Sequence, residues 1–487
     1  MTKQEAVIKY ISENYLEFNR LRHDVVSDKL QVRVAHSLSA PHNATNVIGD
    51  PAEDTALSSY SSEFKGGEHW REMTKNDINS IVCHCAQEYN ANITSREVIT
   101  ALQSDLIPNV HPLREYILSL PAWKPESGDW IDFVAQQVRV RDSAQDIGRG
   151  NAAMGRSQSE LLDGTECLLD NGTHSEASNS PNGASSGSNA DALWRACFKK
   201  WFVAMVASWM KDDVVNHTVL VLVGRQGIFK TTWLDHLMPP ELRAYSSKLP
   251  LSGQITKDDR LRLCENAMLN IDELDAICGR EMNIVKSLLT STDVNERAAY
   301  GRLKERRVRL ASFCASTNNR EFLTDITGNR RWLPFEVESI QNPFHTTLPY
   351  EYLYAQAKHL VEQGWFAYWF DMQEIEELEK HNEEFRAQDN EEQLLPILFD
   401  IPAEGKGEFM TTAEISERLV TFGGIKKPMN TRQLGMLMTK KGFEKKQVYL
   451  SGSTVRGWMV YKRDTDEITL AKKIDNDYAS CQPSDIY

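Results

Sequence analysis

No apolar run in the sequence reaches the roughly 18 residues that a membrane-spanning helix requires. The first residues, beginning at Met1, also lack the apolar segment of a secretory signal peptide. The eight cysteines are scattered instead of being spaced as a disulfide framework, which is typical of a reducing compartment. These absences predict a soluble, cytoplasmic protein with no attachment to a membrane.

The sequence also lacks a convincing metal-ligand pattern. Cys83, His84 and Cys85 stand together, but adjacent side chains on a helix point in different directions, and no second pair has zinc-ligand spacing. We therefore interpret them as structural residues. The net charge of −14 argues against a protein covered uniformly by nucleic acid, so any DNA contact must come from locally basic segments.

The sequence does contain a strand, a glycine turn and a helix start near its middle. Five β-forming residues, 219–223, lead into Gly224, and Lys230 opens a segment that can continue as a helix. Backbone N–H groups of such a loop surround phosphates, the lysine reaches the β- and γ-phosphates, and the next hydroxyl ligates Mg²⁺. The candidate nucleotide-binding residues are Gly224, Gln226, Gly227, Ile228, Phe229, Lys230, Thr231 and Thr232.

One position of this loop departs from the usual pattern, which has glycine directly before the lysine. Here the residue is Phe229, whose backbone N–H is still available to a phosphate. If the position needs a glycine-like φ, the phenylalanine costs about 1 kcal/mol. The sequence alone leaves the effect of Phe229 on the strength of nucleotide binding open.

Three further elements follow in the order that an ATP-hydrolysing core requires. The apolar segment 267–271 ends in Asp272 and Glu273, which suit a Mg²⁺ ligand and a group that polarises the attacking water. The segment 309–317 ends in Asn318, which can orient that water. Arg330 and Arg331 follow on a turn and suit contact with a phosphate across a subunit boundary.

Each of these elements also has an ordinary structural interpretation, as a helix cap, a turn or a solvated charge. Their order at successive strand ends favours the functional interpretation, because the carboxyl ends of neighbouring parallel strands meet at one crevice. The sequence therefore predicts an α/β P-loop ATPase core that uses ATP and Mg²⁺. The candidate catalytic residues are Lys230, Asp272, Glu273, Asn318, Arg330 and Arg331, with Thr231 and Asp272 as the Mg²⁺ ligands.

Two segments concentrate positive charge. Residues 297–309 contain Glu305 as their only acid, and this segment is either a DNA-contacting patch or a solvated strand edge. In 406–463, a helix capped by Thr411, a basic helix capped by Asn430 and a hairpin follow in the order of a winged helix. The candidate DNA-binding residues are Arg297, Arg302, Lys304, Arg306, Arg432, Lys440, Lys441, Lys445 and Lys446.

Composition and periodicity divide the chain into seven segments. Residues 171–190 are mostly Ser, Gly and Asn with no aliphatic residue larger than Ala, so we expect them to be disordered. We interpret the acidic segment 371–392 as an exposed helix. The expected segments are a helix-hairpin and linker at 1–67, a mainly helical domain at 68–140, a disordered insertion at 141–192, the ATPase core at 193–345, a helical connector at 346–400, a winged-helix-like domain at 401–465 and a flexible tail at 466–487.

The motifs together resemble the virulence-associated protein E family over roughly residues 193–340. They are Gly-Arg-Gln-Gly-Ile-Phe-Lys-Thr-Thr (224–232), Ile-Asp-Glu-Leu-Asp (271–275), Arg-Ala-Ala-Tyr-Gly-Arg (297–302), Ser-Thr-Asn (316–318) and Thr-Gly-Asn-Arg-Arg-Trp (327–332). The core of that family is similar to the superfamily 3 helicases and primase-helicases of phages and mobile elements, a branch of the AAA+ fold. Residues 68–140 also resemble the helical region that precedes this core.

The resemblance implies specific roles for the motif residues. Lys230 and Thr231 would bind nucleotide and Mg²⁺, Asp272 and Glu273 would form the Walker B pair, and Asn318 would be the sensor. Arg331 or Arg330 would be the arginine finger supplied to the neighbouring subunit, which implies a ring, expected to be a hexamer. The N-terminal part lacks the carboxylate triad or zinc motif of a primase, so we predict no primer synthesis.

Two functions remain open at this stage. One is an ATP-dependent DNA helicase or translocase in the replication of a mobile element or phage, with single-stranded DNA in the ring and duplex DNA at the winged helix. The other is a nucleotide-binding protein that remodels or senses DNA, for example in defence against phage, with weak or no unwinding.

Overall fold

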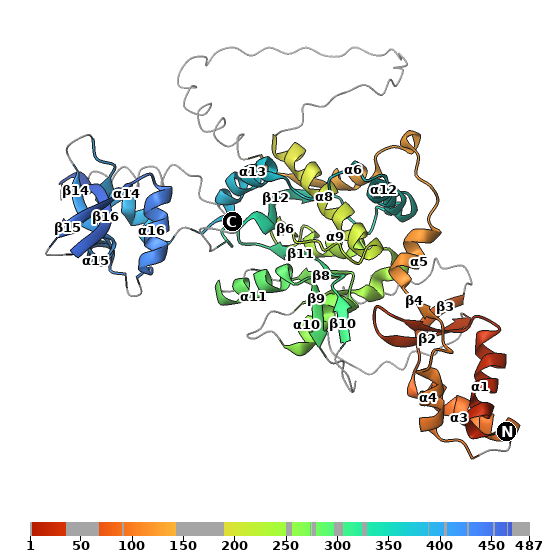
Figure 1. The fold of residues 1–487 in the computed structure, drawn as a ribbon. Helices are drawn as coiled ribbons and strands as arrows, with labels where there is room; N and C mark the ends of the chain where they lie inside the picture. Colours follow the sequence, from red (N-terminus) through yellow and green to blue (C-terminus); the bar gives the residue numbers. More distant parts are fainter. Residues whose placement is uncertain are drawn as a thin grey trace, which may run out of the picture.

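The computed structural model describes residues 2–35, 68–89, 92–142, 189–249, 256–272, 274, 279–296, 305–323, 329–387, 389–403, 407–425, 428–450, 453–464 and 466–469. Three modules follow one another along the chain (Figure 1). The expected linker after 37, most of the insertion and the end of the tail lie outside the described residues. No described helix is long and apolar enough to cross a membrane.

The N-terminal module is a four-stranded sheet covered by helices. Strand order is β3-β2-β1-β4, and the buried side chains of the helices form a core with Leu21 of the sheet. Thr94 and Glu97 form a capping box at the start of α4. The elements are α1 (Lys3–Ile11), β1 (Leu21–Asp24), β2 (Lys29–Ala35), β3 (Glu68–Glu72), α3 (Lys75–Tyr89), α4 (Ser95–Leu102) and β4 (Asn109–Val110).

The central module is built on a six-stranded sheet of order β5-β12-β6-β11-β8-β7. Five strands run parallel, and β5 (Val138–Val140) pairs antiparallel with β12 at one edge. The parallel strands are β6 (Val219–Val223), β7 (Ser246–Lys248), β8 (Met268–Ile271), β11 (Ser312–Thr317) and β12 (Trp332–Ile340). All five residues of β6 are buried, as expected for a parallel strand covered on both faces.

Helices cover both faces of this sheet. Leu220 and Leu222 of β6 face one hydrophobic core, whereas Val219, Val221 and Val223 face the other. The first core is closed by α5 (Pro112–Ser119), α6 (Trp130–Ala135), α8 (Asn189–Met210) and α12 (Tyr350–Gln363). The second is closed by α10 (Lys257–Glu265) and α11 (Gly279–Thr290). The chain also forms α9 (Lys230–His236), α13 (Met372–Asn382) and a hairpin of β9 (Asp293–Glu296) and β10 (Glu305–Val308).

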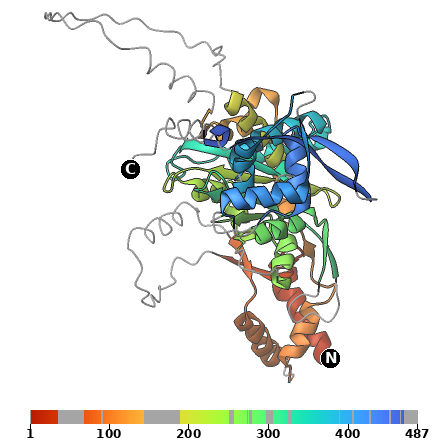
Figure 2. The ribbon, with the colours of Figure 1, turned by 90° about the vertical axis from the view of Figure 1, so that its left-hand side faces the viewer.

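The C-terminal module lies on another side of the central module, toward the viewer in Figure 2. Its core joins helices and antiparallel strands through Leu395, Leu419, Leu437 and Trp458. The helices and hairpin expected between 411 and 461 are present, with Thr411 and Asn430 as caps. The elements are α14 (Asn390–Leu398), β13 (Phe399–Asp400), β14 (Glu408–Thr411), α15 (Thr412–Gly423), α16 (Thr431–Lys440), β15 (Glu444–Leu450) and β16 (Ser453–Lys462).

The structure corrects several expected boundaries. The division at 67/68 is wrong because β3 completes the sheet of β1 and β2. The expected helical domain 68–140 is divided, since α5, α6 and β5 pack in the core of the central module. The connector 346–400 is divided as well, because α14 belongs to the C-terminal core. Ile468, expected in the flexible tail, is buried in that core.

The acidic segment 371–392 is not a uniformly exposed helix. Glu391 and Glu392 are buried at the start of α14, and both guanidinium nitrogens at the tip of Arg386 contact Glu392, at 2.5 and 2.6 Å. Burying a carboxylate requires such a partner, because desolvation of an unpaired charge is costly. Composition alone did not reveal this pair, since its two members are separated by a turn.

Candidate functional site at the carboxyl edge of the central sheet

The loop between β6 and α9 has the backbone geometry that its sequence suggests. Gly227 has φ +84°, and a Cβ on Gly224 would lie 2.8 Å from the carbonyl oxygen of Val337. Phe229 has φ 66° and ψ 19°, in the left-handed region. The position before the lysine therefore does require a glycine-like backbone, as the departure from the usual pattern suggested. A phenylalanine there costs about 1–2 kcal/mol.

Lys230 is buried, and its ammonium group joins the loop to β11. It donates hydrogen bonds to the carbonyl oxygens of Gly224 (2.8 Å) and Arg225 (2.7 Å). It also donates to Oδ1 of Asn318, at 2.9 Å. Two candidate catalytic residues from different motifs thus meet directly. The ammonium thus contacts two loop carbonyls, and Lys230 lines the cavity that the loop borders.

Thr231, Ser316 and Asp272 form a second polar group beside Lys230. The Thr231 hydroxyl lies 3.3 Å from Oδ1 of Asp272 and 2.9 Å from the Ser316 hydroxyl. The Ser316 hydroxyl also donates to the same carboxylate oxygen, at 3.4 Å. Hydroxyl and carboxylate oxygens are the ligands that Mg²⁺ prefers, so Thr231 and Asp272 fit the role of holding this ion.

Lys248, at the end of β7, was not predicted as a site residue. Its ammonium lies 2.7 Å from Oδ2 of Asp272. Burial opposes ionisation of this carboxyl, but the hydrogen bond and charge of Lys248, with hydrogen bonds from Thr231 and Ser316, lower the pKa of Asp272. Asp272 is therefore held as a carboxylate. Sequence reasoning missed Lys248 because the strand that carries it is only three residues long.

Apart from Lys248, the site residues described above line one cavity of about 340 Å³. Its walls come from the loop, from α9 and from the ends of β8 and β11, which are parallel neighbours in the sheet. The lining residues are Gln226, Gly227, Phe229, Lys230, Thr231, Thr232, Asp272, Ser316, Thr317 and Asn318. Ile228 instead packs against the hydrophobic core. Glu273 lies outside the described residues.

Arg330 and Arg331 do not approach this cavity. They end a short 3-10 helix, Asn329–Arg331, that leads into β12, and Trp332 pairs with Val219 at the start of β6. The loop between β6 and α9 follows the other end of β6. The length of this strand, roughly 16 Å at about 3.3 Å per residue, therefore separates the two arginines from that loop. Asn382 holds the arginine turn by donating to the carbonyls of Asn329 and Trp332.

The predicted basic patch 297–309 is only partly supported. Arg297, Arg302 and Lys304 lie outside the described residues. Arg306 is exposed on β10 and contacts Asp293 of β9 at 2.6 Å. Arg309 belongs to no surface patch, because it is fully buried and donates to the carbonyls of Leu288, Leu289, Ser291, Ala311 and Asn216.

The basic residues of the C-terminal module differ in their surroundings, although all five are exposed. Lys440 contacts Glu383 at 2.5 Å, and Lys441 lies 3.6 Å from Glu392. Their charge is therefore used in part at the junction with the central module. Lys445 lies over the ring of Trp458, 5.8 Å from its centroid. Arg432 begins α16 and Lys446 lies on β15.

The fold and the site together define a mixed α/β protein in which a glycine loop, a lysine and a carboxylate meet at the carboxyl edge of a parallel sheet. Residues 180–387 match the model of the virulence-associated protein E-like domain. This is the family that the motif resemblance indicated. A search of curated proteins found no match.

Two similar solved structures are forms of one protein region. The apo structure of the NrS-1 C-terminal region (305–718) shares 10% identity, covers 94% of this chain and 100% of that chain, and has a TM-score of 0.39. The A form apo structure of the same region shares 11% identity, covers 93% and 99%, and has a TM-score of 0.36.

Proposed function

We propose that the central module is a P-loop ATPase of the AAA+ type, similar to superfamily 3 helicases, and that it acts on DNA in the replication of a phage or mobile element. The observation that carries the proposal is the meeting of Lys230, Asn318, Thr231 and Asp272 in one cavity, from three motifs far apart in the sequence. ATP is the proposed substrate, and Mg²⁺ is the proposed cofactor.

Each residue has a distinct task in this proposal. The Lys230 ammonium exchanges its carbonyl partners for phosphate oxygens and stabilises the charge that develops during transfer. Thr231 and Asp272 would hold Mg²⁺, which would neutralise charge on the phosphates. Asn318, fixed at the end of β11 beside Lys230, orients the attacking water. Glu273 is proposed to polarise that water.

We further propose that the protein works as a ring, expected to be a hexamer. Arg331 lies at the opposite end of β6 from the loop of its own chain, so it cannot contact a nucleotide bound there. A neighbouring copy can place its nucleotide against this end of the sheet. Arg331, with Arg330 beside it, then supplies positive charge to the transferred phosphate.

DNA contacts are proposed in two places. The hairpin of β9 and β10, with Arg306 on it and Arg297, Arg302 and Lys304 in its connecting segment, would contact single-stranded DNA in the ring. The C-terminal module has the helix order of a winged helix, and its α16 and hairpin would contact duplex phosphates. Arg432, Lys445 and Lys446 are better placed for this than Lys440 and Lys441, which also contact acids.

The second candidate is a DNA-remodelling or sensing protein, for example in defence against phage, with weak or no unwinding. Two observations favour it. Phe229 strains the loop, and the Lys248 ammonium sits at Asp272, where it competes with Mg²⁺.

A strand-displacement assay on a forked duplex with ATP separates the two candidates. A helicase displaces the strand in the wild type and fails to do so in Lys230→Ala. DNA-stimulated ATP hydrolysis without displacement, for either polarity of overhang, would favour the remodelling candidate.

A further inference from the structure

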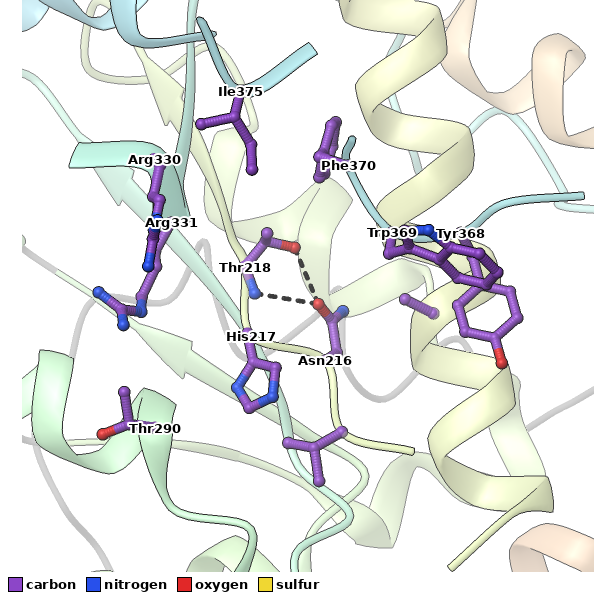
Figure 3. A pocket seen from close by; sticks show the side chains of 12 residues that line it. Asn216, His217, Thr218, Thr290, Arg330, Arg331, Tyr368, Trp369, Phe370 and Ile375 are labelled. Carbon is purple, nitrogen blue, oxygen red and sulfur yellow. Dashed lines mark hydrogen bonds between the residues drawn. The ribbon is translucent and has the colours of Figure 1, made fainter. Parts of the chain in front are cut away.

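A second cavity of about 340 Å³ lies at the amino ends of β6 and β12, away from the candidate ATP site. Figure 3 shows its two kinds of wall. Arg330, Arg331, His217 and Thr290 provide polar groups, and Tyr368, Trp369 and Phe370 bring aromatic rings from the segment between α12 and α13. Neither the proposed catalytic steps nor the proposed DNA contacts assign a role to His217 or to this aromatic wall.

The polar wall has an excess of positive charge. No acid occurs among the described residues that line the cavity, and neither arginine forms an ion pair with a described residue. Burial and the adjacent charge of Arg330 lower the pKa of Arg331, which is only partly exposed. Two neighbouring guanidinium groups without a counter-ion favour binding of an anion, and their planar donors match phosphate geometry.

The backbone around His217 holds its imidazole ring in place at the cavity wall. Its Nδ1 lies 2.7 Å from the carbonyl oxygen of Leu289, and a carbonyl can only accept, so Nδ1 carries the proton. The buried guanidinium of Arg309 donates to the same carbonyl of Leu289 and to the carbonyl of Asn216, each at 2.7 Å. These bonds hold the backbone next to His217 and the backbone that His217 contacts. Nε2 then donates a hydrogen bond whenever the imidazole is protonated.

We propose that this cavity is a receptor for the terminal phosphate of a nucleotide, in which His217 acts together with Arg331. The inference rests on the proposed ATPase function, because the nucleotide is expected on the Lys230 loop of a second copy of this chain. A nucleotide from solution has the same phosphate chemistry, and the experiment separates these two sources. Trp369, which is 59% exposed, offers an apolar contact to the nucleotide from either source.

The charged groups that the described part of the chain places around His217 are Arg330 and Arg331 on the cavity wall and Arg309 behind it. All three are cations, so the surroundings of His217 favour binding of an anion.

The first arm of the test measures binding of inorganic tripolyphosphate by calorimetry to full-length Lys230→Ala, in which the candidate ATP site is disabled. Adding His217→Ala should weaken binding about tenfold, the value of a charge-assisted hydrogen bond. His217→Gln should retain more binding than His217→Ala, because the amide can also donate a hydrogen bond to a phosphate oxygen. His84→Ala is the matched control, since His84 is exposed and anchored through Nδ1 to Tyr10 outside the cavity.

The second arm mixes His217→Ala with an excess of Lys230→Ala subunits and measures ATP hydrolysis. Tripolyphosphate binding that depends on His217, without rescue on mixing, would identify a nucleotide from solution as the source. Rescue on mixing, with normal binding of a fluorescent ATP analogue to His217→Ala, would identify the neighbouring copy. If tripolyphosphate does not bind and mixing does not restore hydrolysis, the receptor proposal is overturned. Absence of hydrolysis in the wild type would instead contradict the ATPase proposal, and the first arm would still decide the receptor.

Discussion

The ammonium of Lys230 lies 2.9 Å from the side-chain oxygen of Asn318, although 88 positions separate them in the sequence. The contact exists because β11 lies between β6 and β8 in the sheet, so its end adjoins both the glycine loop and Asp272. An ammonium can only donate, so the amide oxygen of Asn318 must face Lys230 and its NH₂ group must face away.

The strain at Phe229 can be measured by comparing two substitutions. Phe229→Ala keeps a side chain at φ 66° and loses the edge-to-face contact with Phe344, whereas Phe229→Gly loses the contact and relieves the strain. We expect the glycine variant to be more stable than the alanine variant by about 1 kcal/mol. Urea denaturation with equal m-values gives the difference. Equal stabilities would show that the left-handed backbone costs nothing here.

Lys248 should compete with divalent cations at Asp272. Lys248→Met removes the ammonium that lies 2.7 Å from this carboxylate and leaves the carboxylate to bind Mg²⁺. Because the lysine is well exposed, we expect nucleotide-free Mg²⁺ binding to tighten by no more than about fivefold. The Mg²⁺ dependence of the thermal midpoint gives the affinity. Lys257→Met is a suitable control at a half-buried lysine on α10.

The Arg386–Glu392 pair should stabilise the junction between the central and C-terminal modules. Arg386→Met leaves the Glu392 carboxylate, whose side chain is 2% exposed, without its main partner. We expect a loss of about 3–5 kcal/mol in the free energy of unfolding at pH 7. The double variant Arg386→Met/Glu392→Leu should recover most of it.

The same pair predicts a pH dependence with a definite sign. Burial opposes ionisation of Glu392, but Arg386 outweighs burial and lowers the pKa of this carboxyl. The pair therefore contributes stability at neutral pH that is lost as the pH falls through the lowered pKa. In Arg386→Met the unpaired carboxyl protonates at higher pH, so the stability difference from wild type should shrink between pH 7 and 5. A constant difference would contradict this assignment.

Duplex binding should distinguish two sets of basic residues in the C-terminal module. Arg432→Ala/Lys446→Ala should weaken binding and reduce the slope of log affinity against log salt by about 0.9 for each lost phosphate contact. Lys440→Ala/Lys441→Ala should change the slope less, because those lysines contact Glu383 and Glu392. Fluorescence anisotropy at several salt concentrations measures both. Equal slopes for the two double variants would contradict the distinction.

Local patterns predicted the elements well where chemistry and periodicity agree. The apolar run before Gly224, the caps at Thr411 and Asn430, and the strands before Asp272 and Asn318 all appear where expected. Each of these signals depends only on residues a few positions apart, which a sequence displays directly.

Contacts between distant segments were not predictable in the same way. β3 joins β1 and β2 across the segment 36–67, and Lys248 reaches Asp272 only because β7 and β8 are neighbours. Arg309 was expected in a surface patch because it stands in a basic segment. The sequence does not reveal the backbone carbonyls that enclose its side chain. Such relationships depend on strand order and packing.

The most direct test of the account is Mg²⁺-dependent phosphate release from ATP by wild type, Lys230→Ala and Asn318→Ala, measured together with binding of a fluorescent ATP analogue. We expect Lys230→Ala to lose binding and at least about 100-fold in kcat/KM, and Asn318→Ala to retain binding while losing kcat. Equal phosphate release by wild type and Lys230→Ala would contradict the assignment of this cavity as the site of ATP hydrolysis.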